Sequence, residues 1–209
     1  MTGATIRVWA SPSNPAVRGF EALTPPLAAK DVARYLRELD LAGCASGSFL
    51  LIPLAQTDHH GIAQAMEAAS GGSKALRICL SVDHKSLERV DSRQLAGNQV
   101  GLVLDSVSLT TSAASIVHDV LEAVRFDPTF ITDSQCSIRN DAALRAMLSL
   151  ARSLGLATLG SATAGQRAGK IFEYPFDYVT DLESLGQASA APASANAHRK
   201  SVSRTVRAG

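Results

Sequence analysis

The chain has 209 residues, a formal net charge of +1, and a composition that is 46% hydrophobic and 19% charged. This length is enough for one sizeable core, with or without tails, and the hydrophobic fraction excludes a largely disordered chain. The near-zero net charge produces no whole-molecule field that would mark a nucleic-acid or acidic-membrane partner. No apolar run approaches the roughly 18 residues that a membrane span requires.

The cysteines indicate a reducing compartment. Cys44, Cys79 and Cys136 are scattered and odd in number, and no two of them form a CxxC pair. This pattern argues against a disulfide framework or a zinc site. The first fifteen residues lack the basic start and apolar block of a secretion signal. We therefore expect a cytoplasmic protein.

The composition changes at about residue 186. Residues 186–209 are rich in Ala and Ser and carry basic residues without a single acid. Such a segment cannot bury enough apolar surface to offset its ordering entropy. We therefore predict one folded domain over residues 1–185 and a disordered basic tail over 186–209. The tail is either a solubilising extension or a docking arm for an acidic partner.

Strands and helices are expected to alternate in the first half of the chain. Val32, Leu36 and Leu39 repeat at helical spacing, and a second helix over 62–69 stops at two glycines. Trp9 is expected to pack in the core or at its rim. Strands are predicted over residues 6–10, 17–23, 48–54 and 75–82.

The alternation continues in the second half. The clearest buried strand, 100–104, ends at Asp105, and an apolar stripe over 113–124 predicts an amphipathic helix. A short strand follows at 124–127, closed by Pro128. Asn140 or Asp141 can cap the next helix, which Gly155 ends before a strand at 156–159. Repeated alternation predicts parallel βαβ units, in which function collects at the C-terminal ends of the strands.

Four segments resemble motifs of the EAL family, in the family's order. Residues 17–23 contain Glu-Ala-Leu, and VGLVLD at 100–105 resembles the strand that ends in two adjacent aspartates. Residues 124–131 resemble the Lys-Ile-Asp-Arg-Ser-Phe-Val segment, and 150–156 resemble the helix end before Ala-Glu-Gly-Val-Glu. Gln166 falls where the family often has a glutamine. The resemblance covers roughly residues 5–167.

The resemblance implies an α/β fold, a shortened TIM-like (β/α) barrel of EAL type whose first strand runs against the others. Such barrels typically need about 250 residues, so we expect trimmed helices or an incomplete barrel. The shortfall is expected between Glu21 and Pro53 and after Gln166, where residues 171–178 can replace the family's closing signals. A chance resemblance would instead predict an open doubly wound sheet.

The family's chemistry requires many acids, and this chain has few of them. EAL phosphodiesterases hold two divalent cations, Mg²⁺ or Mn²⁺, which need several carboxylates to offset four positive charges. Glu21, Asp105 and Asp127 match acidic positions of the family, and Arg125 stands at its lysine. The resemblance therefore implies no catalytic residue and no bound metal or cofactor, with Mg²⁺ or Mn²⁺ only if residual phosphodiesterase activity remains. Family ligands are replaced at Pro53, Ser106, Leu159 and Ala162.

Five residues are predicted to bind a ligand without catalysis: Glu21, Asp105, Arg125, Asp127 and Gln166. Arg125 can clamp a phosphate bidentately. The structural alternatives are that Glu21 pairs with Arg125, that Arg125 pairs with Glu21 or Asp127, and that the two aspartates cap helices or bind loop amides.

We therefore expect a catalytically inactive EAL-like regulatory module of bacterial signalling. Its predicted ligand is a regulatory protein partner or cyclic-di-GMP, and no nucleic acid. The protein partner is favoured, because Thr24-Pro25-Pro26 stands where the family has a ligand-contacting arginine. The alternatives are a residual metal-dependent cyclic-di-GMP phosphodiesterase and an unrelated α/β enzyme.

Overall fold

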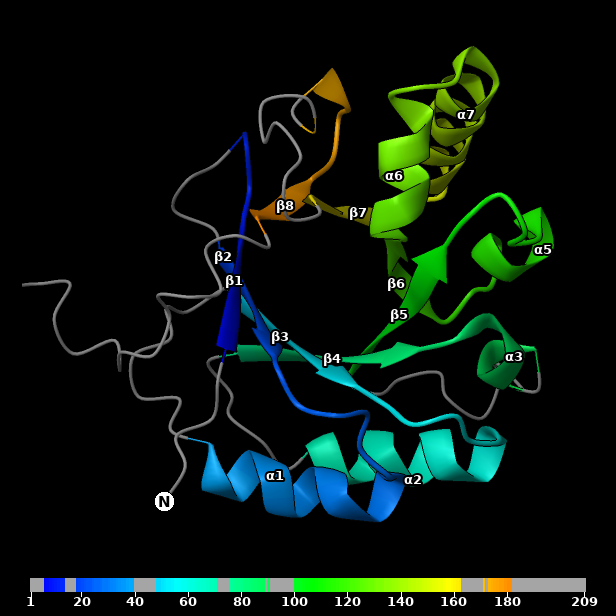
Figure 1. Cartoon of the computed structure of the whole chain (residues 1–209). Coiled ribbons are helices and arrows are strands. Elements are labelled where there is room, and N and C mark those ends of the chain that lie inside the picture. Colours follow the sequence, from blue (N-terminus) through cyan, green and yellow to red (C-terminus); the bar gives the residue numbers. More distant parts are fainter. Residues whose placement is uncertain are drawn as a thin grey trace, which may run out of the picture.

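Eight strands form a closed barrel with helices on its outside (Figure 1). This computed structural model describes residues 6–13, 18–39, 48–70, 76–88, 90, 100–162, 171 and 173–181. The strands are β1 (Ile6–Ala10), β2 (Arg18–Ala22), β3 (Ser48–Pro53), β4 (Leu76–Val82), β5 (Gly101–Val107), β6 (Leu121–Phe126), β7 (Ala157–Ala162) and β8 (Tyr178–Asp181). The helices are η1 (Ala29–Asp31), α1 (Val32–Glu38), α2 (His59–Ser70), α3 (His84–Leu87), α5 (Ala113–Ile116), α6 (Pro128–Ser134) and α7 (Ile138–Ser153).

The strands follow one another around the barrel in chain order. From β2 to β8 each strand is parallel to the next, whereas β1 is antiparallel to both of its neighbours, β2 and β8. The pair Ala10↔Val179 joins β1 to β8 and closes the ring. The reversed first strand was expected, and closure excludes both the incomplete barrel and the open doubly wound sheet.

Short helices explain how the barrel fits into so few residues. Both α3 and α5 have four residues, which is about one helical turn. In contrast, α2 has 12 residues and α7 has 16. The expectation of trimmed helices is therefore confirmed in the described part of the chain. None of the helices described is long and apolar enough to cross a membrane.

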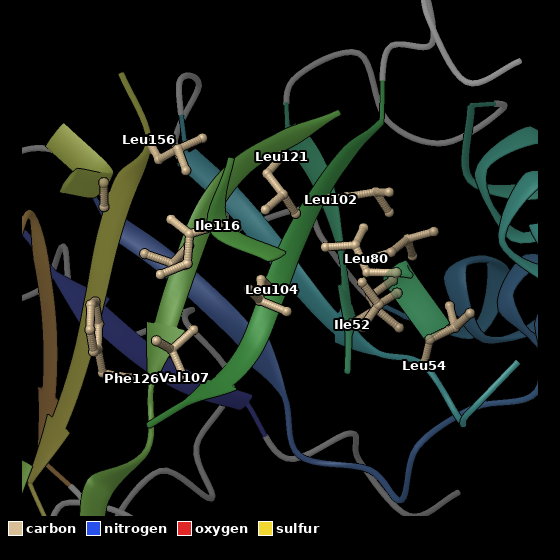
Figure 2. Close-up of a cluster of buried hydrophobic side chains, with 14 of the residues drawn as sticks. Ile52, Leu54, Leu80, Leu102, Leu104, Val107, Ile116, Leu121, Phe126 and Leu156 are labelled. Carbon is tan, nitrogen blue, oxygen red and sulfur yellow. The ribbon is translucent and has the colours of Figure 1, made fainter. Parts of the chain in front are cut away.

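The strands separate two apolar layers, because successive side chains point to opposite faces. The outer layer lies between the barrel and the helices; Figure 2 shows Leu102 and Leu104 of β5 in it. The inner layer fills the barrel below the C-terminal ends of the parallel strands. It contains Trp9, Leu51, Cys79, Val103, Ala123 and Leu159.

The predicted helix over 113–124 is wrong beyond Ile116. Only Ala113–Ile116 is helical, and β6 starts at Leu121 and pairs with β5 and β7. An apolar stripe that changes from helical to strand spacing is ambiguous over a short window, and pairing within the sheet decides it. The helix cap expected at Asn140 or Asp141 is Ser137, whose side chain accepts from Asn140 N. The helix α7 ends just before Gly155, as expected, and this glycine has a φ of 74°.

The residues before β8 pack on the outside of β7. The Phe176 ring lies against Gly160, where a Cβ would come within 2.7 Å of it. Asp177 accepts hydrogen bonds from Thr158 N and Oγ1, both at 2.8 Å. Residues 173–177 thus lead into β8, the strand that closes the barrel. They belong to the segment 171–178, which was expected to replace the sequence signals that close the barrel in the EAL family.

Candidate functional site

Polar side chains gather at the C-terminal ends of four of the five consecutive parallel strands β2 to β6. Glu21 belongs to β2, Ser81 to β4, Asp105 and Ser106 to β5, and Arg125 to β6. We call these five residues the mouth cluster. In (β/α) barrels, this end of the strands is where functional groups collect.

The two-residue repeat of the strands brings these side chains to the inner face. Cys79, Val103 and Ala123 belong to the inner apolar layer. Ser81, Asp105 and Arg125 each follow one of these residues by two positions, and so point the same way. The mouth cluster therefore lies directly above the apolar interior of the barrel.

Arg125 joins the two carboxylates of the cluster. Its Nε donates to Asp105 Oδ1 at 2.7 Å and its Nη2 donates to Asp105 Oδ2, which makes a fork on one carboxylate. Its Nη1 donates to Glu21 Oε1. All three side chains are well shielded from solvent, with exposed fractions of 17% for Arg125, 7% for Glu21 and 19% for Asp105.

Two serines complete the environment of Asp105. Ser81 Oγ donates to Oδ2 at 2.7 Å, and Ser106 Oγ donates to Oδ1 at 3.2 Å. Burial on its own would raise the pKa of Asp105. The charge and hydrogen bonds of Arg125, together with Ser81 and Ser106, outweigh burial and hold this pKa below its usual value. Asp105 is therefore ionised at neutral pH.

An irregularity in β5 follows Asp105, which the regular register of β5 with β6 already places beside Arg125. The pairing of β5 with β6 shifts between Leu104↔Val124 and Val107↔Phe126, so two residues of β5 face Arg125 alone. Ser106, the second of them, has a φ of 55°, which is uncommon for a residue other than glycine. The bulge returns Val107 to the outer layer while Asp105 stays on the inner face.

Comparison with known proteins identifies the fold. No family model matches the chain, and no curated protein matches it. Three similar solved structures are the EAL domain of FimX from Pseudomonas aeruginosa bound to c-di-GMP, the PaMucR phosphodiesterase in complex with c-di-GMP, and Klebsiella pneumoniae BlrP1 with manganese and c-di-GMP. Their TM-scores are 0.61, 0.62 and 0.62, and their identities are 11%, 16% and 14%. Each alignment covers 86% of this chain, and it covers 87%, 93% and 54% of the respective solved chain.

The chain has the fold of an EAL domain. At these identities the likeness is one of fold, as the motif order in the sequence predicted. The EAL fold places Glu21, Asp105 and Arg125 side by side, although 104 residues separate Glu21 from Arg125 in the chain. Their predicted role in binding a ligand stays a prediction.

The structure gives Asp127 a different role. Asp127 is the N-cap of α6, where its side chain accepts from Thr129 N at 2.7 Å and Phe130 N at 3.4 Å. This was the structural alternative considered for it. Gln166 lies outside the described residues. The pair of Arg125 with Glu21, which was one of the structural alternatives, is present, and the second acid on Arg125 is Asp105 rather than Asp127.

Ser81 was missed by the analysis of the sequence, and Ser106 was considered only as a lost aspartate. The signal for Ser81 was its position two residues after Cys79, at the C-terminal end of a largely apolar strand. A hydroxyl offers no metal-ligand pattern, so nothing in the motif comparison pointed to it. Its role is to donate to a neighbouring strand, which a single sequence does not reveal.

The oxygen atoms that the mouth cluster offers do not suit a pair of divalent cations. Both oxygens of Asp105 accept from Arg125, and Oε1 of Glu21 accepts from the same guanidinium. Within the described ranges, no group of three or more His, Cys, Asp or Glu side chains is placed to hold a metal ion. Hard divalent cations require six or more oxygen ligands, several of them usually anionic. Of the carboxylates that match the family motifs, Glu21 and Asp105 already bind a guanidinium and Asp127 caps a helix.

Proposed function

We propose that the chain is a catalytically inactive EAL-fold module of bacterial signalling that acts in the cytoplasm by binding a protein partner. One observation carries the proposal: the guanidinium of Arg125 is bound by both Glu21 and Asp105. The third acid that matches the family motifs, Asp127, caps α6. The free thiols described, Cys79 and Cys136, support a reducing compartment.

The engaged carboxylates argue against hydrolysis. Two-metal hydrolysis of a phosphodiester needs cations that activate water and stabilise the leaving oxygen. A cation entering the mouth cluster would have to displace a guanidinium that remains charged at any accessible pH. Removing a single transition-state donor commonly costs about 10²–10³ in rate, and here several acidic positions of the motifs are replaced together.

Charge also favours a protein partner over cyclic-di-GMP. Glu21, Asp105 and Arg125 sum to a charge of −1, and three nitrogens of Arg125 already donate to carboxylates. A ligand with two phosphodiester anions would find this guanidinium already engaged by carboxylates.

Hydrolysis is tested by incubating the purified protein with cyclic-di-GMP and Mn²⁺ and analysing the products. We expect no linear dinucleotide, whereas an active EAL phosphodiesterase treated in parallel produces it. Turnover by the wild type that Glu21→Gln abolishes and Asp127→Asn preserves would overturn the inactive assignment. The Asp127→Asn variant is the matched control, because asparagine caps a helix about as well as aspartate.

Ligand choice is tested by titrating cyclic-di-GMP calorimetrically in the presence and absence of Mn²⁺. We expect no heat of binding in either titration. Tight binding without turnover would replace the protein-partner assignment with that of a nucleotide receptor. The structural neighbours that were solved with c-di-GMP make this the alternative to measure.

A further inference from the structure

We propose that the barrel opens locally at the seam between β1 and β8, where the closed ring is built with its weakest junction. In this opening, β1 and β8 part from each other while the other strands stay paired. One edge of each strand becomes free, and free strand edges are surfaces to which extended protein segments bind. The opening is independent of what the chain binds or hydrolyses, so the proposed function can fail without it.

The backbone pairing at the seam is the sparsest in the described barrel. A single register pair, Ala10↔Val179, joins β1 to β8, whereas β1 shares five pairs with β2 and β8 shares four with β7. Continuing the seam's register by two residues would place Val8 opposite Asp181, but these two described residues form no pair. Each strand is therefore held more firmly by its other neighbour than by the seam.

A side-chain hydrogen bond takes over where the backbone pairing stops. Thr180 Oγ1 donates to Val8 O at 2.8 Å, so the Val8 carbonyl faces β8 and is bound there by a hydroxyl. In the described residues, this is the one hydrogen bond across the seam beyond the pair Ala10↔Val179. The outer side of β1 adds little support, because the Val8 side chain is 41% exposed.

Apolar packing holds β1 from the inside. Trp9 is fully buried in the inner layer, and its Nε1 has no hydrogen-bond partner among the described residues. Packing is not directional, so it keeps β1 against the interior without fixing its pairing with β8. Separation of the seam therefore costs less than separation of any boundary that is joined by a longer ladder.

Cys79 reports whether the interior becomes accessible. It belongs to the same inner layer as Trp9, and burial raises the pKa of its thiol to about 11. The thiolate is the reactive form of cysteine, so this thiol is protected from alkylation while the barrel is closed. Alkylation of Cys79 in the folded protein consequently requires the barrel to open.

The experiment measures the rate at which iodoacetamide alkylates Cys79 in the intact chain, with mass spectrometry separating this site from Cys44 and Cys136. We expect the rate to stay nearly constant at low urea, because local opening exposes little surface, and to rise only near the unfolding transition. A rate that follows global unfolding at every urea concentration would overturn the proposal.

The variant Thr180→Val locates the opening, because it keeps the shape of the side chain and removes the hydrogen bond across the seam. It should raise the low-urea rate about fivefold, since one hydrogen bond is lost from the closed form. Thr111→Val is the matched control. Thr111 is similarly buried, and its hydroxyl accepts from Ser108 N at 3.0 Å, but it lies in the loop after β5.

The control should leave the low-urea rate unchanged. Equal rates in the two variants, or no effect of Thr180→Val, would contradict opening at the seam. If Thr180→Val does not fold, the urea profile of the wild type decides the outcome.

Discussion

Arg125 acts through the shape of its side chain as well as its charge. A guanidinium presents several donors in one plane, so that it forks onto Asp105 and still reaches Glu21. Burial on its own would lower the pKa of Arg125, but the neighbouring charges of Asp105 and Glu21 raise it above its usual value. Arg125 therefore keeps its charge at any accessible pH.

The substitution Arg125→Lys should destabilise the protein although it preserves the charge. An ammonium has no planar fork, so one contact to Asp105 or the contact to Glu21 is lost. We expect the free energy of unfolding in urea, measured by Trp9 fluorescence, to fall by about 1–3 kcal/mol. Arg145→Lys, at an exposed pair, should change it by less than about 0.5 kcal/mol. Equal effects of the two substitutions would contradict the importance of the fork.

The lowered pKa of Asp105 predicts a loss of stability in acid. A carboxyl whose pKa is lower in the folded state stabilises the protein above its unfolded pKa of about 4. That contribution disappears as the pH falls through the lower folded value. The stability difference between the wild type and Asp105→Asn should therefore be constant above about pH 5 and shrink toward pH 2. A difference that does not depend on pH would exclude this coupling.

At the level of residues, prediction from the sequence succeeded where the position of a residue on its strand determined which way its side chain points. Glu21 and Arg125 occupy inward positions near the ends of predicted strands, so their pairing was foreseeable. The bulge at Ser106 was not, because a one-residue shift in register depends on the neighbouring strand and leaves no local signature. The regular register before that shift already places Asp105 beside Arg125, whereas the hydrogen bond from Ser106 to Asp105 depends on the bulge and appears only in the fold.

At the scale of elements, residues 173–177 pack against β6, β7 and α7 before β8 begins. Phe176 packs edge-on against Phe126 with ring centroids 5.7 Å apart, and the Tyr174 hydroxyl donates to Asp141 at 2.9 Å. Together these contacts cover the outside of β7 and connect it to α7. The segment's position depends on the missing side chain of Gly160.

The substitution Gly160→Ala should displace Phe176 and destabilise the barrel. A Cβ at this position would lie 2.7 Å from the ring, well inside van der Waals contact. Overpacking of this kind commonly costs about 1–3 kcal/mol in free energy of unfolding. In urea unfolding, Phe176→Leu combined with Gly160→Ala should cost less than the sum of the two single changes. Simple additivity would show that the ring and the glycine do not interact.

Element prediction was accurate where one period persisted and failed where the period changed. The stripe of α7 continues over 16 residues and was recognised as a helix. The apolar stripe at 113–124 contains one turn of helix and then a strand. Over so few residues an apolar run is compatible with either the helical or the strand period. Only hydrogen bonding to β5 and β7 separates them.

At the scale of the whole molecule, the barrel depends on both ends of the folded chain. β1 and β8 meet at Ala10↔Val179, and Thr180 Oγ1 donates to Val8 O at 2.8 Å. Tyr178 packs edge-on against Phe49 with ring centroids 4.9 Å apart. The sequence indicated the α/β class through its alternation, but closure rests on contacts between residues more than 160 positions apart.

Truncation should separate the barrel from the predicted tail. A chain that ends at residue 185 keeps β8, and we expect it to unfold at the same temperature as the full chain. A chain that ends at residue 177 leaves β1 and β7 with unpaired edges. It should show no cooperative thermal transition by Trp9 fluorescence. If the longer truncation product were strongly destabilised, the domain boundary placed near residue 186 would be wrong.

A crystal soaked in MnCl2 and measured at the manganese absorption edge tests the central claim most directly. Our account predicts no anomalous peak at the mouth cluster, with the guanidinium of Arg125 still bound to Glu21 and Asp105. One or two manganese ions bridged by Glu21 and Asp105, with Arg125 turned away, would contradict it.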